Sequence, residues 1–232
     1  MTNVSPNANQ VLYVSSFQQL VSTPFHDTIN AICWSRTLTG NFAEIVAKAA
    51  SKENITVLGP EELAALELTE KGQLARTILL EDFHLLTAHG ASPSINIIRQ
   101  YDRDDDNSFF PTDVYSYHAD RSPVPTDTFL CTYYGEPSDI LPNAQAIQKV
   151  LVPAIREQVK KLYNGAEKDF ESFLKEHFFD LHYMAAPGAS PISLGTGNLW
   201  RLAVDHPGSK VLPCVHRAPK EKEGESRLLL IC

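Results

Sequence analysis

The tetrapeptide YHAD, at positions 117–120, places an imidazole and a carboxylate two residues apart. On an extended segment, residues i and i+2 face the same side of the chain, so His118 and Asp120 can reach one object. Both groups are common ligands of divalent metal ions. The third ligand has to come from a distant segment, and we choose His216, near the end of a late apolar stretch. His206 is an alternative, but its VDHPGS context is typical of a turn. The sequence therefore predicts a metal site formed by His118, Asp120 and His216.

Two histidines and one carboxylate on one face of a metal form the ligand set of non-heme Fe(II) oxygenases. Where such an enzyme uses 2-oxoglutarate, the far carboxylate of this cosubstrate needs a buried cation, and a guanidinium can bond both of its oxygens. Arg227 lies eleven residues after His216, at the start of the strand-like segment SRLLLIC. A hairpin between the two would place them on neighbouring strands beside one cavity. Arg201 and Arg99, also in strand-like segments, are alternatives.

Hydroxyl groups are expected to complete the pocket for this carboxylate. Thr132 and Tyr133 lie on the strand-like segment that follows the H-x-D motif. A competing interpretation makes Arg227 a solvated charge balanced by Glu223 or Glu225. The order of H-x-D, a late histidine and then an arginine favours the first interpretation, so we predict that Arg227, Thr132 and Tyr133 bind the cosubstrate.

The segments that must position these residues change in character along the chain. Residues 1–90 are expected to be mostly helical, with Gly90 ending a long amphipathic helix. Residues 91–140 and 190–232 contain alternating or apolar segments rich in β-branched and aromatic residues, which predict strands. Helical spacing returns over residues 143–184, which we interpret as an insertion.

This order of elements predicts a mainly β fold with flanking helices, of the α+β class. Strands early and late in the sequence are expected to lie side by side in an antiparallel, cupin-like jelly roll, preceded by a helical region and interrupted by the helical insertion. The chain has 232 residues, of which 43% are apolar and 21% charged. These values suit one domain that spans residues 1–232.

Charge and composition exclude some classes of partner. The net charge of -8 and the lack of a cationic cluster argue against tight binding of nucleic acid. No stretch approaches 18 apolar residues, so no membrane partner is expected. The four cysteines are far apart and form no C-x-x-C pair, which indicates reduced thiols and a cytoplasmic protein.

The order of these motifs resembles the signature of Fe(II)/2-oxoglutarate-dependent dioxygenases. Within that superfamily, three segments are similar to a bacterial family of unknown function that has CTY-x-G and VHR-x-P motifs: INAICWSRTL, HADRSPVPTDTFLCTYYGEPS and CVHRAPKEKEGESRLLLIC. The resemblance covers the first of these segments and residues 112–140 and 192–231. It implies a double-stranded β-helix with a metal site, but no substrate, since that family has no settled reaction. The insertion at 143–184 departs from the pattern.

The expected function is therefore that of an enzyme, a dioxygenase that uses Fe(II) and 2-oxoglutarate to hydroxylate a small molecule or a peptide. Iron would be held by His118, Asp120 and His216, and Arg227 would bind the cosubstrate. The alternative is a non-catalytic cupin-like protein that holds zinc or iron through the same ligands. Such a protein has no need of a carboxylate clamp, so Arg227 separates the two. The native metal and the oligomeric state stay open at this level.

Overall fold

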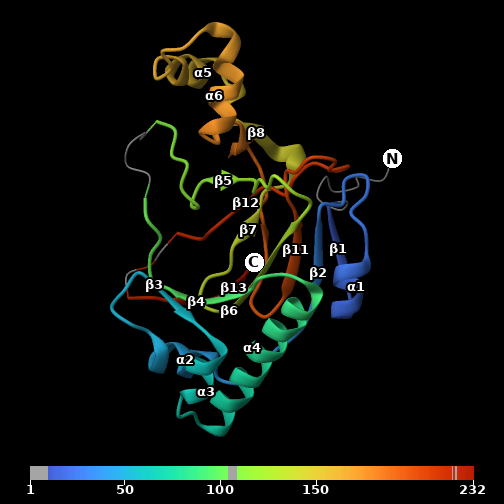
Figure 1. The fold of residues 1–232 in the computed structure, drawn as a ribbon, viewed down its shortest axis with the longest axis vertical. Helices are drawn as coiled ribbons and strands as arrows, with labels where there is room; N and C mark the ends of the chain where they lie inside the picture. The colour runs from blue at the N-terminus through green and yellow to red at the C-terminus, as the bar shows by residue number, and fades with distance from the viewer. Residues whose placement is uncertain (1–9, 104–108, 221, 223) are drawn as a thin grey trace.

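The computed structural model describes residues 10–103, 109–220, 222 and 224–232. Two β-sheets face each other, and helices lie at both ends of the pair (Figure 1). This arrangement confirms the predicted α+β class. It is also compatible with a jelly roll, because late strands lie between early ones in the large sheet.

The large sheet has seven strands and is antiparallel except for the β1–β2 pair. In spatial order its strands are β1 (Val11–Val14), β2 (Ala31–Trp34), β11 (Leu199–Ala203), β6 (Asp127–Tyr134), β13 (Arg227–Ile231), β4 (Ser94–Ile98) and β3 (Ile55–Leu58).

The small sheet has six short strands and carries the H-x-D motif. Its order is β10 (Ile192–Ser193), β7 (Asp139–Ile140), β12 (His216–Arg217), β5 (Tyr117–His118), β9 (His182–Ala185) and β8 (Ala146–Gln148).

Six α-helices accompany the sheets within the described residues. They are α1 (Phe17–Ser22), α2 (Phe42–Ala49), α3 (Pro60–Ala65), α4 (Glu70–His89), α5 (Pro153–Lys160) and α6 (Phe170–Glu176). Four 3-10 turns lie in or beside the insertion: η1 (Asn143–Gln145), η2 (Lys149–Leu151), η3 (Glu167–Asp169) and η4 (Phe179–Leu181).

The longest helix, α4, begins and ends where its sequence signals predict. The Thr69 side chain accepts a hydrogen bond from the Gly72 amide at its N-terminus. Gly90 ends it with φ of 95°, a left-handed conformation that glycine adopts without a Cβ penalty. The predicted helix end at Gly90 is therefore confirmed.

A buried ion pair ties α4 to the large sheet. Arg36, which follows β2, donates from both terminal nitrogens to the Asp82 carboxylate on α4, with Nη1 at 2.6 Å from Oδ1. The Tyr133 hydroxyl of β6 donates to the same carboxylate at 2.6 Å. The Asp82 side chain is 2% exposed, so these partners replace its water completely.

Apolar side chains cover both faces of the large sheet. On the helix side, Leu79 and Leu86 of α4 pack with residues such as Phe129 of β6. On the other side, Leu130 and Trp200 pack against Ile140 and Cys214, which belong to the region of the small sheet. The alternation along β6 thus directs Leu130 and its same-face neighbours into the space between the sheets.

The N-terminal part contains the four helices α1 to α4 and also three strands. Strands β2 and β3 join the large sheet on opposite sides of its centre, by pairing with β11 and β4. Only partners from distant segments supply the hydrogen bonds that make such four-residue stretches strands, which is why local periodicity favoured helix over much of this region.

The hairpin predicted between His216 and Arg227 is wrong. His216 lies on β12 in the small sheet, whereas Arg227 lies on β13 in the large sheet. The intervening segment crosses from one sheet to the other instead of turning back. The two residues therefore approach the space between the sheets from opposite sides.

The insertion forms a small unit with its own apolar cluster, at the end of the sheets opposite α2, α3 and α4 (Figure 1). Phe170 and Leu174 of α6 are buried there against Phe110 and Phe179. The insertion is not purely helical, because β8 and β9 pair with each other and β9 pairs with β5. This pairing brings the insertion directly beside the H-x-D strand. In the described part of the chain, no helix is long and apolar enough to cross a membrane.

Candidate metal centre

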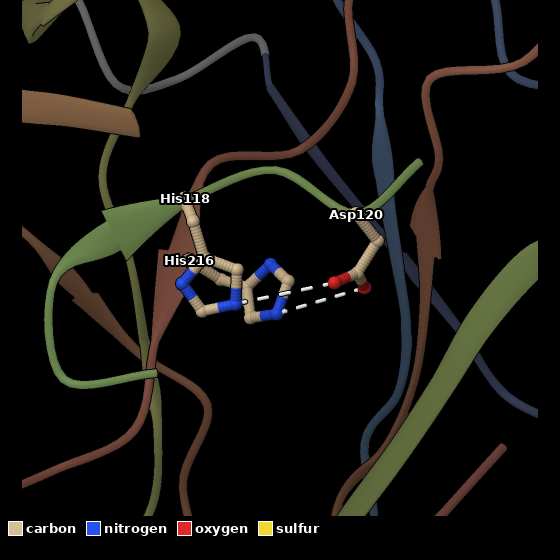
Figure 2. Close-up of side chains that lie close together, drawn as sticks. All are labelled: His118, Asp120 and His216. Carbon is tan, nitrogen blue, oxygen red and sulfur yellow. Dashed lines mark ion pairs between the residues drawn. The ribbon is translucent and has the colours of Figure 1, made fainter. Parts of the chain in front are cut away.

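The three predicted ligands come together between the sheets. His118 of β5 and His216 of β12 are directly opposite in an antiparallel pair, and their ring centroids are 4.6 Å apart. Asp120 follows β5 and turns its carboxylate toward both rings (Figure 2). One ligand atom from each residue lies within 4.8 Å of the other two. The structure thus forms a His-Asp-His group that can hold a metal ion.

The separations of the ligand atoms suit a common ion. Nε2 of His118 is 3.9 Å from Oδ1 of Asp120, and Nε2 of His216 is 3.8 Å from Oδ2. Two atoms that each bond one ion at about 2.1 Å are at most about 4.2 Å apart. Both distances fall inside that limit, so each imidazole is within reach of an ion bound to the carboxylate oxygen nearest to it.

Backbone contacts orient both imidazoles toward the centre. Nδ1 of His118 is 2.8 Å from the Ser116 carbonyl, and Nδ1 of His216 is 3.3 Å from the Cys214 carbonyl. A carbonyl can only accept, so Nδ1 carries the proton in each ring and the Nε2 lone pair faces the centre. This second-shell arrangement is the usual one for histidines that bind metals.

The charge states of the ligands also suit metal binding. Burial, together with the nearby His216, lowers the pKa of His118 to about 4, which keeps its ring neutral at pH 7. Burial alone would raise the pKa of Asp120, but His216 and the Thr128 hydroxyl are the main causes that bring it below its ordinary value. A neutral imidazole and an ionised carboxylate are the forms that coordinate metals.

Thr128 is a site residue that the sequence analysis missed. Its hydroxyl donates to Oδ2 of Asp120 at 2.5 Å, from the face of β6 that looks into the space between the sheets. Its position two residues before Leu130 and four before Thr132 is the signal that could have identified it, because all three share one face of the strand.

Replacing Thr128 with valine should weaken metal binding by roughly tenfold, because second-shell partners of metal ligands contribute 10- to 100-fold in affinity. Valine matches the shape of threonine but leaves Asp120 without its hydroxyl donor. Titration with Co²⁺, followed by its visible absorption, measures the effect. Thr128→Ser keeps the hydroxyl and should retain affinity within a factor of about three. Equal affinities for the two variants would contradict the role of the hydroxyl.

A third histidine, His182, extends the row formed by His216 and His118. It is opposite His118 on β9, with ring centroids 5.9 Å apart, and it is 4% exposed. Its Nδ1 contacts the Phe178 carbonyl at 2.8 Å. His182 is not part of the ligand group, and the sequence did not reveal its place because it belongs to the insertion.

Two cavities meet at His118 and Asp120. An inner cavity of about 130 Å³ lies between the sheets and is also lined by His216, Tyr101 and Ser138. An outer pocket of about 320 Å³ opens on the side of the insertion. The candidate metal centre therefore lies between a smaller space and a larger one that is more open to solvent.

Arg227 does not line the inner cavity; it lines a narrower pocket of about 20 Å³ that shares Tyr101 with the cavity. It is 9% exposed, and it donates to the Glu136 carbonyl at 2.7 Å and to the Ser138 hydroxyl at 3.1 Å. Burial lowers the pKa of Arg227, although a guanidinium stays protonated in proteins. The Tyr101 hydroxyl is a further neighbour of this group. Ser138 and Tyr101 therefore connect Arg227 to the cavity that holds the ligands.

The charge of Arg227 is not balanced by an ion pair within the described residues. The Glu136 carboxylate pairs with Lys222 instead, at 2.7 Å. Glu225 is exposed, and Glu223 lies outside the described residues. Nη1 of Arg227 is buried and has no hydrogen-bond partner among the described groups. This nitrogen is thus available to an added acceptor.

The other predicted cosubstrate residues differ in position. Thr132 is 2% exposed on the inward face of β6, and its hydroxyl bonds no other described group, but it does not line the inner cavity. Tyr133 faces the opposite side, where its hydroxyl bonds Asp82 beneath α4. The structure does not bring Tyr133 to the cavity, because successive residues of a strand alternate between faces.

The alternatives left open by the sequence lie away from the centre. Arg201 is bonded to Asp127 and to backbone carbonyls at the end of α1. Arg99 donates to the Ser51 carbonyl on an exposed edge. His206 sits on a turn and is not part of the ligand group.

Comparison of the chain with known protein families, with curated proteins and with solved structures found no match. The functional argument therefore depends on the geometry of the site itself.

Proposed function

We propose that this protein is an Fe(II)- and 2-oxoglutarate-dependent dioxygenase, with a small molecule or a peptide as its substrate. The observation that carries the proposal is the set of residues that line the inner cavity. The His-Asp-His group lines this cavity together with Ser138 and Tyr101, both of which are neighbours of the buried Arg227.

The donor set suits iron. Two imidazole nitrogens and one carboxylate oxygen converge from β5, the residues after it, and β12, which is the ligand type of non-heme Fe(II) oxygenases. Among the described residues, no fourth histidine, cysteine or acid joins the group. Three protein ligands leave positions on the metal for a cosubstrate and for dioxygen.

The surroundings of Arg227 suit a carboxylate. Nη1 of Arg227 is a buried donor without a partner in the described structure, and the Ser138 hydroxyl is beside the same guanidinium. A buried guanidinium without a counter-charge is costly unless an anion binds to it. A dicarboxylate that reaches from the metal to Arg227 would supply that charge, and 2-oxoglutarate has a carboxylate at each end.

When bound, iron and 2-oxoglutarate together supply the oxidising chemistry, in which dioxygen converts the cosubstrate to succinate and carbon dioxide while the substrate is hydroxylated. The chain supplies position and environment. His118, His216 and Asp120 hold the metal, and Thr128 holds the Asp120 carboxylate in place. Arg227 and Ser138 orient the cosubstrate. The apolar side chains that line the inner cavity, Leu130, Leu229 and Ile231 among them, exclude water from it.

The alternative, a non-catalytic protein that holds zinc or iron, uses the same three ligands. It gives no reason for a buried arginine that contacts two residues of the cavity and has no ion pair within the described residues. Arg227 is therefore the residue on which the two functions differ, and the test is built on it.

Anaerobic addition of Fe(II) and then 2-oxoglutarate to the metal-free protein should produce the weak visible charge-transfer band of an iron chelate of a 2-oxo acid. Arg227→Gln should keep Fe(II) binding but lower the affinity for 2-oxoglutarate by more than about 30-fold. This factor corresponds to about 2 kcal/mol, the cost of removing one partner from a buried charge pair. Titration of the band measures both affinities.

Arg217→Gln is the matched control. Arg217 is next to His216, but its guanidinium bonds Asp139 and stacks on the Tyr117 ring, away from the inner cavity. The Arg217→Gln variant should bind 2-oxoglutarate with the same affinity as the unmodified protein. A protein that binds the metal but produces no band, or an Arg227→Gln variant with full affinity, would contradict the proposed function.

A further inference from the structure

The outer pocket borders two residues of the candidate metal centre and is lined in part by the insertion. Its walls include the apolar side chains Val114, Ala119, Phe178 and Leu181, next to His118 and Asp120 of the candidate metal centre. Two of these four, Phe178 and Leu181, come from the insertion. The insertion therefore forms part of the wall of a pocket that borders two metal ligands.

The pocket offers no free positive charge. Arg121 is the single arginine or lysine among the described residues that line it. Its Nη2 bonds Asp180 at 2.5 Å, and its Nε bonds Asp205 at 2.7 Å. These two aspartates neutralise the cation. Among the described residues that line the pocket, no lysine or arginine is left for an anionic group of a ligand.

Phe178 occupies an unusual position at the rim of this pocket. Its φ is 58°, in the left-handed region that side chains other than glycine, asparagine and aspartate rarely adopt. Its carbonyl accepts from Nδ1 of His182 and from the Leu181 amide, which hold the backbone in this conformation. The side chain is nevertheless 53% exposed, so burial of the ring does not account for the strain. The left-handed conformation ends α6 directly after its C-cap His177, and it leaves Phe178 at the mouth of the pocket instead of in a core.

We propose that the outer pocket receives an uncharged apolar group of the substrate, and that Phe178 contacts this group and selects for it. The inference rests on the proposed function, because it takes the metal centre that borders the pocket as the place of reaction. It gives the insertion a purpose: the pairing of β9 with β5 joins the insertion to the H-x-D strand, and Phe178 lines the same pocket as His118 and Asp120. An aromatic ring at the rim favours a planar or branched apolar group by contact with its face.

Two probes of the same shape test the class of ligand. Benzyl alcohol is neutral and benzoate is an anion, and both carry one phenyl ring. Saturation-transfer NMR with the metal-free full chain should detect benzyl alcohol and give at least about fivefold less transfer to benzoate. Equal or stronger transfer to benzoate would overturn the assignment of an uncharged ligand.

Two variants test the role of Phe178. Phe178→Ala should weaken the binding of benzyl alcohol by about fivefold, the ratio that corresponds to the loss of one aromatic contact. Phe178→Gly also removes the ring but suits the left-handed backbone, so it should show the same loss with no loss of stability. Phe109→Ala is the control, since Phe109 is 38% exposed and does not line the pocket. Unchanged binding in either Phe178 variant would overturn the proposal.

Failure of this inference is distinguishable from failure of the proposed function. The NMR measurement needs no metal, whereas the proposed function is tested by the band that Fe(II) and 2-oxoglutarate produce. Phe178→Ala should give that band at full strength, because Phe178 does not line the inner cavity. If Phe178→Ala lost both the charge-transfer band and the binding of benzyl alcohol, Phe178 would belong to the metal centre, and its role as a substrate contact would be overturned.

Discussion

Replacing His216 with alanine is expected to weaken binding of Fe(II) or Co²⁺ by more than about a hundredfold, because even second-shell partners of metal ligands contribute up to that factor. The substitution removes one of the three ligand atoms that lie within 4.8 Å of one another. The remaining pair, His118 and Asp120, comes from one short segment and cannot enclose an ion from two sides. Titration of the metal-free protein with Co²⁺, followed by its visible absorption, measures the affinity.

His206→Ala is the matched control for this experiment. His206 was the other candidate for the third ligand, and it lies on a turn where Nδ1 contacts the Pro207 carbonyl. Its loss should leave the Co²⁺ affinity unchanged. If His206→Ala lost the metal and His216→Ala kept it, the arrangement in Figure 2 would not be the site.

Replacing Asp82 with alanine is expected to lower the free energy of unfolding by about 3 to 5 kcal/mol, the usual cost of removing one partner from a buried ion pair. The change leaves the Arg36 guanidinium and the Tyr133 hydroxyl without the carboxylate that both bond. The apolar packing of Leu79 and Leu86 then holds α4 on the large sheet without the ion pair. Urea unfolding, followed by circular dichroism, measures the loss.

Glu81→Ala provides the comparison on the same helix. Glu81 is exposed and precedes Asp82, so its removal should change the free energy of unfolding by less than about 0.5 kcal/mol. Metal affinity should persist in Asp82→Ala under conditions where the variant is folded, because the ion pair is on the face of β6 opposite Thr128. A loss below about 1 kcal/mol in Asp82→Ala would show that Arg36 and Tyr133 find other partners.

The sequence was sufficient to choose the residues of the candidate centre because each choice depended on local geometry. Two residues on extended chain share a side, which joined His118 to Asp120. The apolar stretch before His216 and the turn around His206 decided the third ligand. Arg227 was chosen by its residue type and its order after His216. The structure places His118, Asp120 and His216 around one inner cavity, whereas Arg227 does not line it and contacts Ser138 and Tyr101, which do.

The register and the sheet of each strand depended on contacts that the sequence does not display. A hairpin from His216 to Arg227 was a reasonable expectation from eleven residues of separation, but the chain crosses to the other sheet. Tyr133 was assigned to the cavity on the strength of its hydroxyl. The pairing of β6 turned this side chain toward Asp82 instead.

The sequence by itself determined which side chains are available as ligands, because the identities of two imidazoles, a carboxylate and a guanidinium do not depend on the fold. The tertiary structure alone decided that His182 lies opposite His118, that Phe178 of the insertion lines the same pocket as His118, and that Thr128 holds Asp120. The physical reason is the range of the interactions involved. Periodicity and turn signals act over a few residues, whereas strand pairing joins segments about a hundred residues apart through backbone hydrogen bonds that any side chain permits.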